Sequence, residues 1–365
     1  GAALAVIKNN DVIVSEGFGY ANLESKVPVN PKTIFQSGSV GKQFTSAGIM
    51  KMVEENLLRL DESILKYIAE GPKKWKSITI RHLLTHSSGI PDYTSEEFDY
   101  SKNYSEEDLV EMASKLDLEF SAGKRWNYSN TGYVLLGVIM SRVAKKPYWE
   151  YLDEHIFTPA GMHSIRINTE KDIVPNKAKG YIPSKEGYQH ASYVAPITNT
   201  TADGSMLLSL EDLLAWNSTV KNKMILKRKS WNLILSPMKL NSGNNYPYGF
   251  GWFIEKQNEK TVHQHGGTWQ GFTAQIFRFI EDELEVLLLT NARSIAAYEL
   301  PRKIAALINP SLKAQSLPTK PIVDEMPEIT KLIREKLINI SNGKLELDDF
   351  SFIRQTVFPL SLIHI

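Results

Sequence analysis

The stretch Thr33-Ile-Phe-Gln-Ser-Gly-Ser-Val-Gly-Lys42 places a serine and a lysine three residues apart, where an extended segment gives way to a helical pattern. Residues 39–56 repeat apolar side chains at helical spacing. Because residues three apart share one face of a helix, Lys42 can approach the hydroxyl of Ser39. Partial burial lowers the pKa of a lysine, and backbone N–H groups at a helix start favour negative charge. The stretch therefore predicts that Ser39 is a nucleophile and that Lys42 activates it.

The Ser-x-x-Lys pattern is weak evidence by itself, and its surroundings separate one copy from the others. It starts at six positions, which are Ser39, Ser63, Ser121, Ser218, Ser236 and Ser341. Ser39 follows an extended lead-in and opens a predicted helix, whereas Ser121 lies in a predicted turn. The copies at residues 63, 218 and 236 fall at helix or loop positions. Ser39 is therefore the candidate nucleophile.

Two further motifs could complete a site with this pair. Tyr128-Ser-Asn130 stands just before a predicted buried helix, and a phenol there can relay a proton while an amide orients a substrate carbonyl. His265-Gly-Gly267 stands between two predicted strands, where an imidazole can polarise a carbonyl and Gly267 lets a substrate backbone approach. Each motif also has a structural interpretation: Tyr128 as a packed aromatic, Asn130 as a helix cap, and His265 as part of a tight hairpin turn.

Predicted strands lie at both ends of the chain, with predicted helices between them. Residues 3–8 and 12–16 are typical of a hairpin, and residues 250–255, 261–264, 272–280 and 284–290 of a meander. Helices are predicted at 79–85, after the capping boxes at Ser105 and Ser209, and at 131–144, 148–157 and 296–308. The order predicts an α+β fold, in which an antiparallel sheet built from both chain ends is flanked by helices and carries a mostly helical inserted subdomain.

This arrangement predicts one main domain, residues 1–312. Its sheet part covers about 1–55 and 246–312, and its helical part about 56–245. A cleft between the two parts is the expected place for a site. Residues 313–365 are predicted to form a linker and an incomplete C-terminal extension, with a short helix at 329–338 and a tail suited to one or two strands.

Composition excludes several classes of function. The chain of 365 residues has 42 Lys and Arg against 41 Asp and Glu, and its net charge of +1 argues against nucleic-acid binding. The absence of cysteine excludes disulfides, thiolate metal sites and cysteine nucleophiles. No apolar run reaches the length that spans a bilayer, and no signal peptide is recognised at the start. The oligomeric state is left open.

Two other hydrolase types are weaker hypotheses. A metal hydrolase could use His263 with His265 on one strand face, or His82 with His86 on a helix. However, no His-Glu-x-x-His occurs, and neither pair has a carboxylate at a known ligand spacing. An α/β-hydrolase is disfavoured because Gly-x-Ser-x-Gly is absent. No metal or cofactor is expected.

The three motifs together resemble those of serine β-lactamases and penicillin-binding proteins, in the same order and with similar spacing. They are most similar to the branch with class C β-lactamases, carboxylesterases and D-aminopeptidases, where the second motif is Tyr-x-Asn and the third can start with His. The resemblance covers about residues 1–308. It extends to five other stretches, which are 80–91, 159–162, 202–206, 212–216 and 248–252.

The resemblance implies a mechanism and a set of roles. Ser39 would attack a carbonyl and form an acyl-enzyme, with Lys42 and Tyr128 sharing the role of general base. The backbone N–H groups of Ser39 and Thr268 would form the oxyanion hole. Asn130 and His265, with Gly267 beside them, would hold the substrate. The implied substrate is a small molecule or short peptide, and the implied location is periplasmic or extracellular.

The chain departs from the family pattern at the third motif, where no Lys-Thr-Gly occurs and His265 replaces the lysine that binds a β-lactam carboxylate. We therefore expect an ester or a short peptide amide as substrate. The alternatives are a β-lactamase or DD-carboxypeptidase, and a sensor that binds penicillin or peptide without turnover. The resemblance also implies a helix before the first strand, and loops at about 93–103 and 176–200 that set the substrate.

Overall fold

The computed structural model describes residues 1–94, 98–169, 172–293, 295–313 and 324–341. The chain divides into two compact units, Gly1–Lys313 and Ala314–Ile365. Within the second unit, the predicted short helix is present as α10 (Pro327–Ser341). The predicted strands of the tail lie outside the described residues. The division of the first unit into a sheet part and a helical part stays a prediction.

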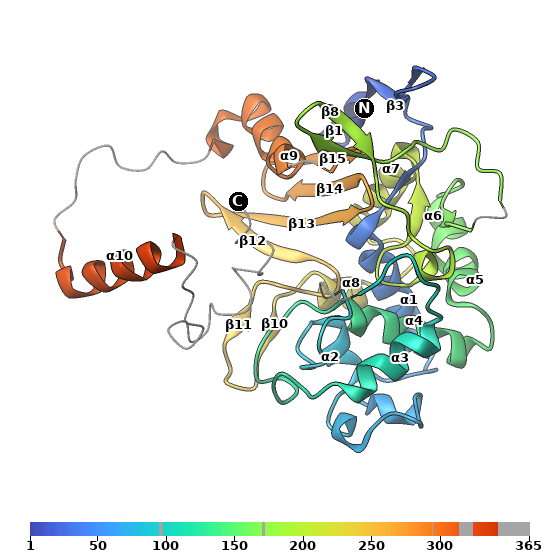
Figure 1. Ribbon diagram of the computed structural model, residues 1–365, viewed down its shortest axis with the longest axis vertical. Coiled ribbons are helices and arrows are strands. Elements are labelled where there is room, and N and C mark those ends of the chain that lie inside the picture. The colour runs from blue at the N-terminus through green and yellow to red at the C-terminus, as the bar shows by residue number, and fades with distance from the viewer. Residues whose placement is uncertain (95–97, 170–171, 294, 314–323, 342–365) are drawn as a thin grey trace. The chain divides into compact units, whose positions relative to one another are not determined.

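One six-stranded antiparallel sheet joins the two ends of the first unit (Figure 1). Its order is β12 (Phe253–Gln257), β13 (Lys260–Trp269), β14 (Phe272–Phe279), β15 (Leu284–Thr290), β1 (Ala2–Lys8) and β2 (Asp11–Phe18). The first strand lies between the last strand and the second, with Ala5 opposite Leu287. The predicted N-terminal hairpin, the meander and the α+β fold class are therefore confirmed.

The central strands are buried on both faces, which explains their nearly continuous apolar sequences. On one face, α9 (Ile295–Ile308) packs through Ala305 on Phe277 and Val286. The other face, which carries Ile276 and Leu287, joins the main core with the helices. The site must therefore lie at an edge or an end of the sheet, where backbone and side chains are still accessible.

The helices between the sheet strands follow the sequence prediction closely. They include α1 (Lys42–Glu54), α2 (Ile80–Leu84), α3 (Glu106–Lys115), α4 (Asn130–Ala144), α5 (Tyr148–Leu152), α6 (Thr158–Ala160), α7 (Leu210–Lys221) and α8 (Arg228–Ile234). Capping boxes open α3 and α7 at Ser105 and Ser209, as predicted, and a third opens α2 at Thr79. Short strands complete this part: β3 (Tyr20–Asn22), β4 (Val27–Pro28), β5 (Phe35–Gln36), β6 (Arg166–Ile167), β7 (Tyr181–Ser184), β8 (Gly187–His190), β9 (Met206–Leu208), β10 (Met238–Lys239) and β11 (Asn245–Tyr246).

Three boundaries differ from the prediction. The helix expected from Ser39 begins as a 3₁₀ turn, Gly38–Gly41, and becomes α-helical only at Lys42. The helix expected at 148–157 continues from α5 as a π-helical segment, Asp153–Phe157. The tight turn considered for His265-Gly-Gly267 is wrong, because these residues lie inside β13, which extends to Trp269. Glycine has low strand propensity, so the sequence pattern ended this strand too early.

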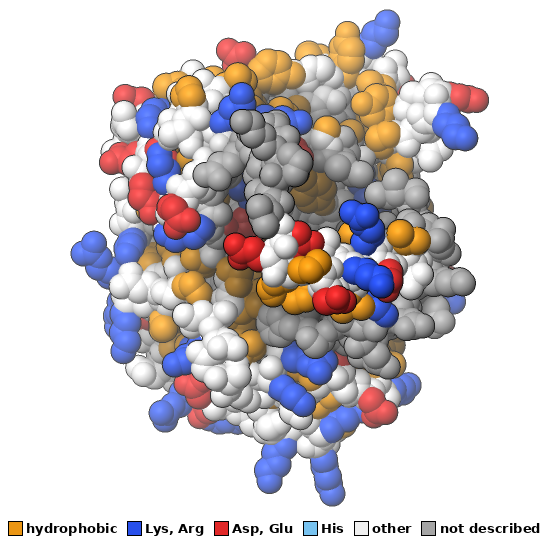
Figure 2. Space-filling view, turned by 90° about the vertical axis from the view of Figure 1, so that its left-hand side faces the viewer, with side chains coloured by type: hydrophobic (Ala, Val, Ile, Leu, Met, Phe, Trp, Pro, Cys, Tyr) orange, Lys and Arg blue, Asp and Glu red, His pale blue; other side chains and the backbone are white. Residues whose placement is uncertain are grey.

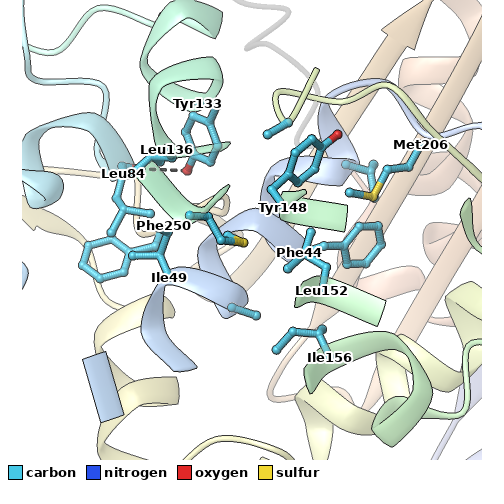
Figure 3. Packing of buried hydrophobic residues seen from close by; sticks show 14 of the residues in the cluster. Phe44, Ile49, Leu84, Tyr133, Leu136, Tyr148, Leu152, Ile156, Met206 and Phe250 are labelled. Atoms are coloured by element: carbon cyan, nitrogen blue, oxygen red, sulfur yellow. Dashed lines mark hydrogen bonds between the residues drawn. The ribbon is translucent and has the colours of Figure 1, made fainter. Parts of the chain in front are cut away.

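The core around α1 fixes the base of the site (Figure 3). Phe44 packs edge-on against Phe157 and Trp216, with ring centroids 5.5 and 5.0 Å apart. A Cβ on Gly48 would lie 2.5 Å from Leu152, so α1 and α5 are in close contact there. Close packing on this scale leaves little freedom for the first turn of α1, which carries Lys42.

Basic and acidic side chains are interspersed over the face shown in Figure 2, in keeping with a net charge of +1. Among the described residues, no helix is both long and apolar enough to cross a membrane.

Candidate active site

The structure brings Ser39 and Lys42 together at the junction of the 3₁₀ turn and α1. The Nζ atom of Lys42 donates to Ser39 Oγ at 3.1 Å. The lysine side chain is fully buried, whereas Ser39 is partly exposed. The Ser39 hydroxyl is therefore accessible from outside, whereas the Lys42 amine beside it is shielded from water.

Two further acceptors hold the Lys42 amine. Asn130 Oδ1 and the backbone carbonyl of Asp203 each accept from Nζ at 2.7 Å. Burial lowers the pKa of Lys42 to about 8, against the opposing pull of the Asp203 and Asp92 carboxylates. A protonated amine uses all three hydrogens on these partners, and a neutral amine keeps one lone pair free for a proton from Ser39.

Tyr128 lies just before α4 and lines the same cavity as Ser39. Burial raises the pKa of the Tyr128 phenol well above its usual value, so the phenol is protonated at neutral pH. Its ring lies against the imidazole of His86 at 4.2 Å between centroids, and Lys42 Nζ lies 4.9 Å from the Tyr128 centroid. Tyr128 is therefore a proton donor in the resting site.

Asn130 is the first residue of α4, and the helix is capped by Ser129 rather than by Asn130. The cap considered for Asn130 is thus wrong, and its side chain is free to serve the site. Its Nδ2 atom and backbone N–H both donate to Asp92 Oδ2, at 3.0 and 2.8 Å. Since Nδ2 contacts a carboxylate and Oδ1 contacts Lys42, the orientation of the amide is fixed.

His265 makes its polar contacts inside the protein. Its Nδ1 atom lies 2.6 Å from the carbonyl of Gly266, and its Nε2 atom lies 3.1 Å from the Tyr248 hydroxyl. The same hydroxyl lies 3.1 Å from Nε2 of His86, whose Nδ1 accepts from the backbone N–H of Ser129 at 3.1 Å. We call this chain, His86–Tyr248–His265, the buried relay.

The proton positions along the buried relay follow from its one unambiguous donor, the N–H of Ser129. Because His86 Nδ1 accepts, His86 Nε2–H donates to Tyr248, and Tyr248 then donates to His265 Nε2. His265 is left with its proton on Nδ1, facing the Gly266 carbonyl. Burial lowers the pKa of His265 to about 3 and that of His86 well below its usual value, and the nearby Lys42 acts in the same direction. Both imidazoles are therefore neutral.

The backbone amides of Ser39 and Thr268 lie side by side. Gly38 has φ of +48°, and a Cβ there would lie 2.6 Å from Thr268 N. A Cβ on Gly267 would lie 2.8 Å from Ser39 N. Glycine is needed at both positions because the strand approaches the 3₁₀ turn so closely. The two N–H groups are thus near enough to serve one oxyanion.

A cavity of about 450 Å³ opens beside Ser39. It is lined by Ser39, Tyr128, Phe253, Gln264, His265, Gly266, Thr268, Gln275, Phe277, Tyr298, Glu299 and Arg302. Arg302, a cation on its wall, is already bound to Glu255 and Gln257. Within the described residues, β12 pairs with β13 only as far as Gln264, so the segment from Gly266 to Thr268 has no strand partner on that side.

Three of the four histidines considered for a metal site have other partners. His82 Nδ1 contacts Thr79 at the start of α2, and both nitrogens of His86 and His265 belong to the buried relay. In the part of the chain that the structure describes, no group of three or more His, Cys, Asp or Glu side chains could hold a metal ion.

Comparison with known families gives the identity of the fold. The model of the family described as Beta-lactamase matches residues 1–308. This chain belongs to the beta-lactamase family. Penicillin-binding protein 4* of Bacillus subtilis (strain 168) is 30% identical over 316 residues, which are 82% of this chain and 69% of that protein. Protein flp of Staphylococcus aureus (strain MW2) is 28% identical over 309 residues, or 80% of this chain and 60% of its own length.

Solved structures of this family agree with the match. The octameric penicillin-binding protein homologue from Pyrococcus abyssi has a TM-score of 0.74 and 30% identity, and the match covers 84% of this chain and 73% of that one. A penicillin-binding protein from Bacillus halodurans has a TM-score of 0.75 and 25% identity, with 84% and 96% covered. The D-amino acid amidase from Ochrobactrum anthropi SV3, at 23% identity and a TM-score of 0.75, shows the same fold. As a member of the beta-lactamase family, the chain is a serine hydrolase.

Sequence reasoning missed several side chains that support the site of this beta-lactamase-family chain. Asp92 and Asp203 flank Lys42 and Asn130, and the buried relay includes His86 and Tyr248. Three of these four lie in stretches that carried the resemblance, at 80–91, 202–206 and 248–252, where no role was assigned to them. Asp92 follows the first stretch directly, and no pattern marked it.

Removing the hydroxyl of the buried relay is expected to weaken both the fold and the site. Tyr248→Phe leaves His86 Nε2–H and His265 Nε2 without their partner, at a cost of about 1–3 kcal/mol in unfolding free energy. Because β13 and the Tyr128 segment lose a common contact, kcat/KM for an ester should fall about tenfold or more.

Urea unfolding and the rate of fluorophosphonate labelling measure the two effects of Tyr248→Phe. Tyr188→Phe, at a tyrosine that is 60% exposed, is the matched control. Unchanged stability and labelling rate in Tyr248→Phe would show that the relay does not support the site.

Proposed function

We propose that this chain hydrolyses an ester or amide bond through an acyl-enzyme on Ser39. The observation that carries the proposal is the buried Lys42 amine, 3.1 Å from Ser39 Oγ and with its pKa lowered to about 8. A desolvated lysine is a suitable base for a serine hydroxyl because its neutral form is populated near neutral pH.

The residues of the site support the following sequence of steps. Ser39 Oγ attacks the carbonyl carbon, its proton passes to neutral Lys42, and the oxygen that gains the negative charge accepts from the N–H groups of Ser39 and Thr268. Tyr128 gives its phenolic proton to the leaving group and regains a proton from Lys42. Water then attacks the acyl carbon by the reverse path and releases Ser39.

The cavity favours a substrate without an essential carboxylate. His265 is neutral and occupied by the buried relay, and Arg302 is occupied by Glu255 and Gln257. The wall beside Ser39 offers instead the rings of Phe253 and Phe277 with neutral amides. The side of β13 from Gly266 to Thr268 that no strand pairs with suits an extended peptide backbone, which can add to a sheet edge. An ester or a short peptide amide fits these features better than a β-lactam.

The substrate proposal is tested by comparing three reagents on one preparation. A fluorophosphonate should give one covalent adduct by intact mass, p-nitrophenyl acetate should turn over, and nitrocefin should turn over at least tenfold less efficiently. A long-lived adduct with a fluorescent penicillin, without ester turnover, would favour the sensor instead. Efficient nitrocefin hydrolysis would favour the β-lactamase. The implied location outside the cytoplasm stays a proposal, which cell fractionation tests.

The rate of ester hydrolysis should rise with pH through the pKa of Lys42. Raising the pH removes the proton from the amine, and the neutral amine is the form that accepts the proton of Ser39. The expected profile of kcat/KM for p-nitrophenyl acetate is a single limb that levels off above about pH 8. Measurements from pH 6 to 9.5, corrected for spontaneous hydrolysis, should show it. A profile that is flat over this range would remove Lys42 from the role of base.

A further inference from the structure

A second cavity, of about 480 Å³, lies on the helical side of the sheet, apart from the residues that line the Ser39 cavity. Its wall comes from α7 and α8 and from strands β13, β14 and β15. The lining residues are Val220, Lys221, Lys223, Asn232, Leu235, Ser236, His263, Arg278, Ile280, Glu283 and Glu285. We call it the helix–sheet cavity.

The floor of the helix–sheet cavity is a row of polar side chains across three strands. His263 lies opposite Arg278, and Arg278 lies opposite Glu285. They share a sheet face with Ile276 and Leu287, which belong to the main core. Polar side chains in register on a face that is otherwise apolar are costly to desolvate unless they meet partners.

The hydrogen bonds of these polar side chains are incomplete. Arg278 is only 6% exposed, and its Nε atom has no hydrogen-bond partner. No ion pair joins Arg278 to a carboxylate among the described residues, because Glu285 pairs instead with Lys221, at 3.0 Å. Nδ1 of His263 is also buried without a partner. Arg278 Nε, which is a donor, and His263 Nδ1 therefore lack partners on two neighbouring strands that line the cavity, as does Oε2 of Glu285 on the third strand.

The charges around the helix–sheet cavity favour an anion. Lys221, Lys223 and Arg278 supply three positive charges, and Glu283 and Glu285 supply two negative ones. Glu283 is exposed at the rim. Burial lowers the pKa of His263 to about 4, so this side chain adds a neutral donor or acceptor and no charge. The guanidinium of Arg278 presents its donors in a planar fork that matches the oxygens of a carboxylate or phosphate.

We propose that the helix–sheet cavity binds a small molecule through an oxyanion group, a carboxylate or a phosphate, held by Arg278 and Lys221. The ligand completes the hydrogen bonds of Arg278 and balances the excess positive charge. Asn232 and Ser236, on α8 and just after it, provide neutral contacts on the opposite wall. The inference is independent of the reaction at Ser39.

Binding is tested with inorganic phosphate and with acetate, each against sodium chloride at equal ionic strength. The midpoint of thermal unfolding of the full chain should rise with one of the two ions and saturate, and calorimetry should give one site. Saturation by phosphate alone assigns a phosphate ligand, and saturation by acetate alone assigns a carboxylate. No saturable response to either ion overturns the proposal.

Variants locate the site. Arg278→Gln and Lys221→Gln should each weaken binding of the responding ion about tenfold or more, because each removes a charged donor. Lys229→Gln, at an exposed position of α8 outside the cavity lining, removes the same charge and should bind as the wild type does. Equal binding by all four proteins would contradict the assignment.

A folding control keeps the test decisive. Fluorophosphonate labelling of Ser39 should proceed at the wild-type rate in each variant, which shows that loss of ion binding is not loss of the fold. If Arg278→Gln does not fold, Lys221→Gln alone decides the outcome, since this lysine is partly exposed.

Discussion

Replacing Ser39 with alanine should lower ester hydrolysis by about 10⁴-fold or more and abolish covalent labelling. In the proposed mechanism the Ser39 oxygen is the atom that forms the acyl bond. Tyr128 lines the same cavity as Ser39, and burial holds its phenol in the protonated, weakly nucleophilic form. Intact mass after incubation with a fluorophosphonate, with p-nitrophenyl acetate hydrolysis in parallel, measures both effects.

The sequence provides a matched control for this variant. Ser121 also starts a Ser-x-x-Lys pattern but lies exposed before a turn. Ser121→Ala should keep the full rate and the adduct. A persistent single adduct in Ser39→Ala would mean that another residue is the nucleophile, and peptide mapping would identify it.

Replacing Lys42 with methionine should lower kcat/KM for p-nitrophenyl acetate by about 10²–10⁴-fold, the usual range for the loss of a general base. Methionine has a similar length and no charge, so the change removes the proton acceptor while it fills much of the same space. The rising limb of the pH profile should disappear with the amine. A limb near pH 8 that remains in Lys42→Met would assign the titration to another group.

The same variant should change the pH dependence of stability in a defined direction. The pKa of Lys42 is about 8 in the folded protein, against 10.5 for an ordinary lysine. Between these values the unfolded chain binds more protons than the folded one, so the unfolding free energy of the wild type rises with pH. Below pH 8 the charged, buried amine lowers the unfolding free energy by about 3 kcal/mol relative to its value at pH 10.5.

Urea unfolding at pH 7 and pH 10 for both proteins isolates this effect, because other titrating groups cancel in the comparison. The wild type should gain stability relative to Lys42→Met as the pH rises. A constant difference would mean that the amine is not desolvated as the structure indicates.

The pattern in the sequence was sufficient for an antiparallel sheet built from both chain ends and for the pairing of Ser39 with Lys42. Ser39 and Lys42 are neighbours on one turn, so local spacing predicts their contact. Asn130 and the Asp203 carbonyl reach Lys42 from 88 and 161 residues away, and only the folded chain brings them there. Spacing along the chain carries no information on such distant contacts.

His265 shows a second limit of sequence reasoning. Its position suggested that it holds the substrate, because the motif says which residue stands there but not where its nitrogens point. In the structure both nitrogens face Tyr248 and the Gly266 backbone. The tautomer depends on Ser129, a partner of His86 that belongs to a different motif. Several motifs thus meet in one hydrogen-bonded chain that no single motif could reveal.

The central place of β1 has a consequence for synthesis of the protein. β1 is synthesised before β15, and about 275 residues lie between Lys8 and Leu284, so the sheet cannot close until this stretch has been made. At about 5–20 residues per second, β1 waits roughly 15–60 s with one edge unpaired. The apolar edge of β1 is thus exposed over this interval, and a nascent chain in this state is a natural client for chaperones.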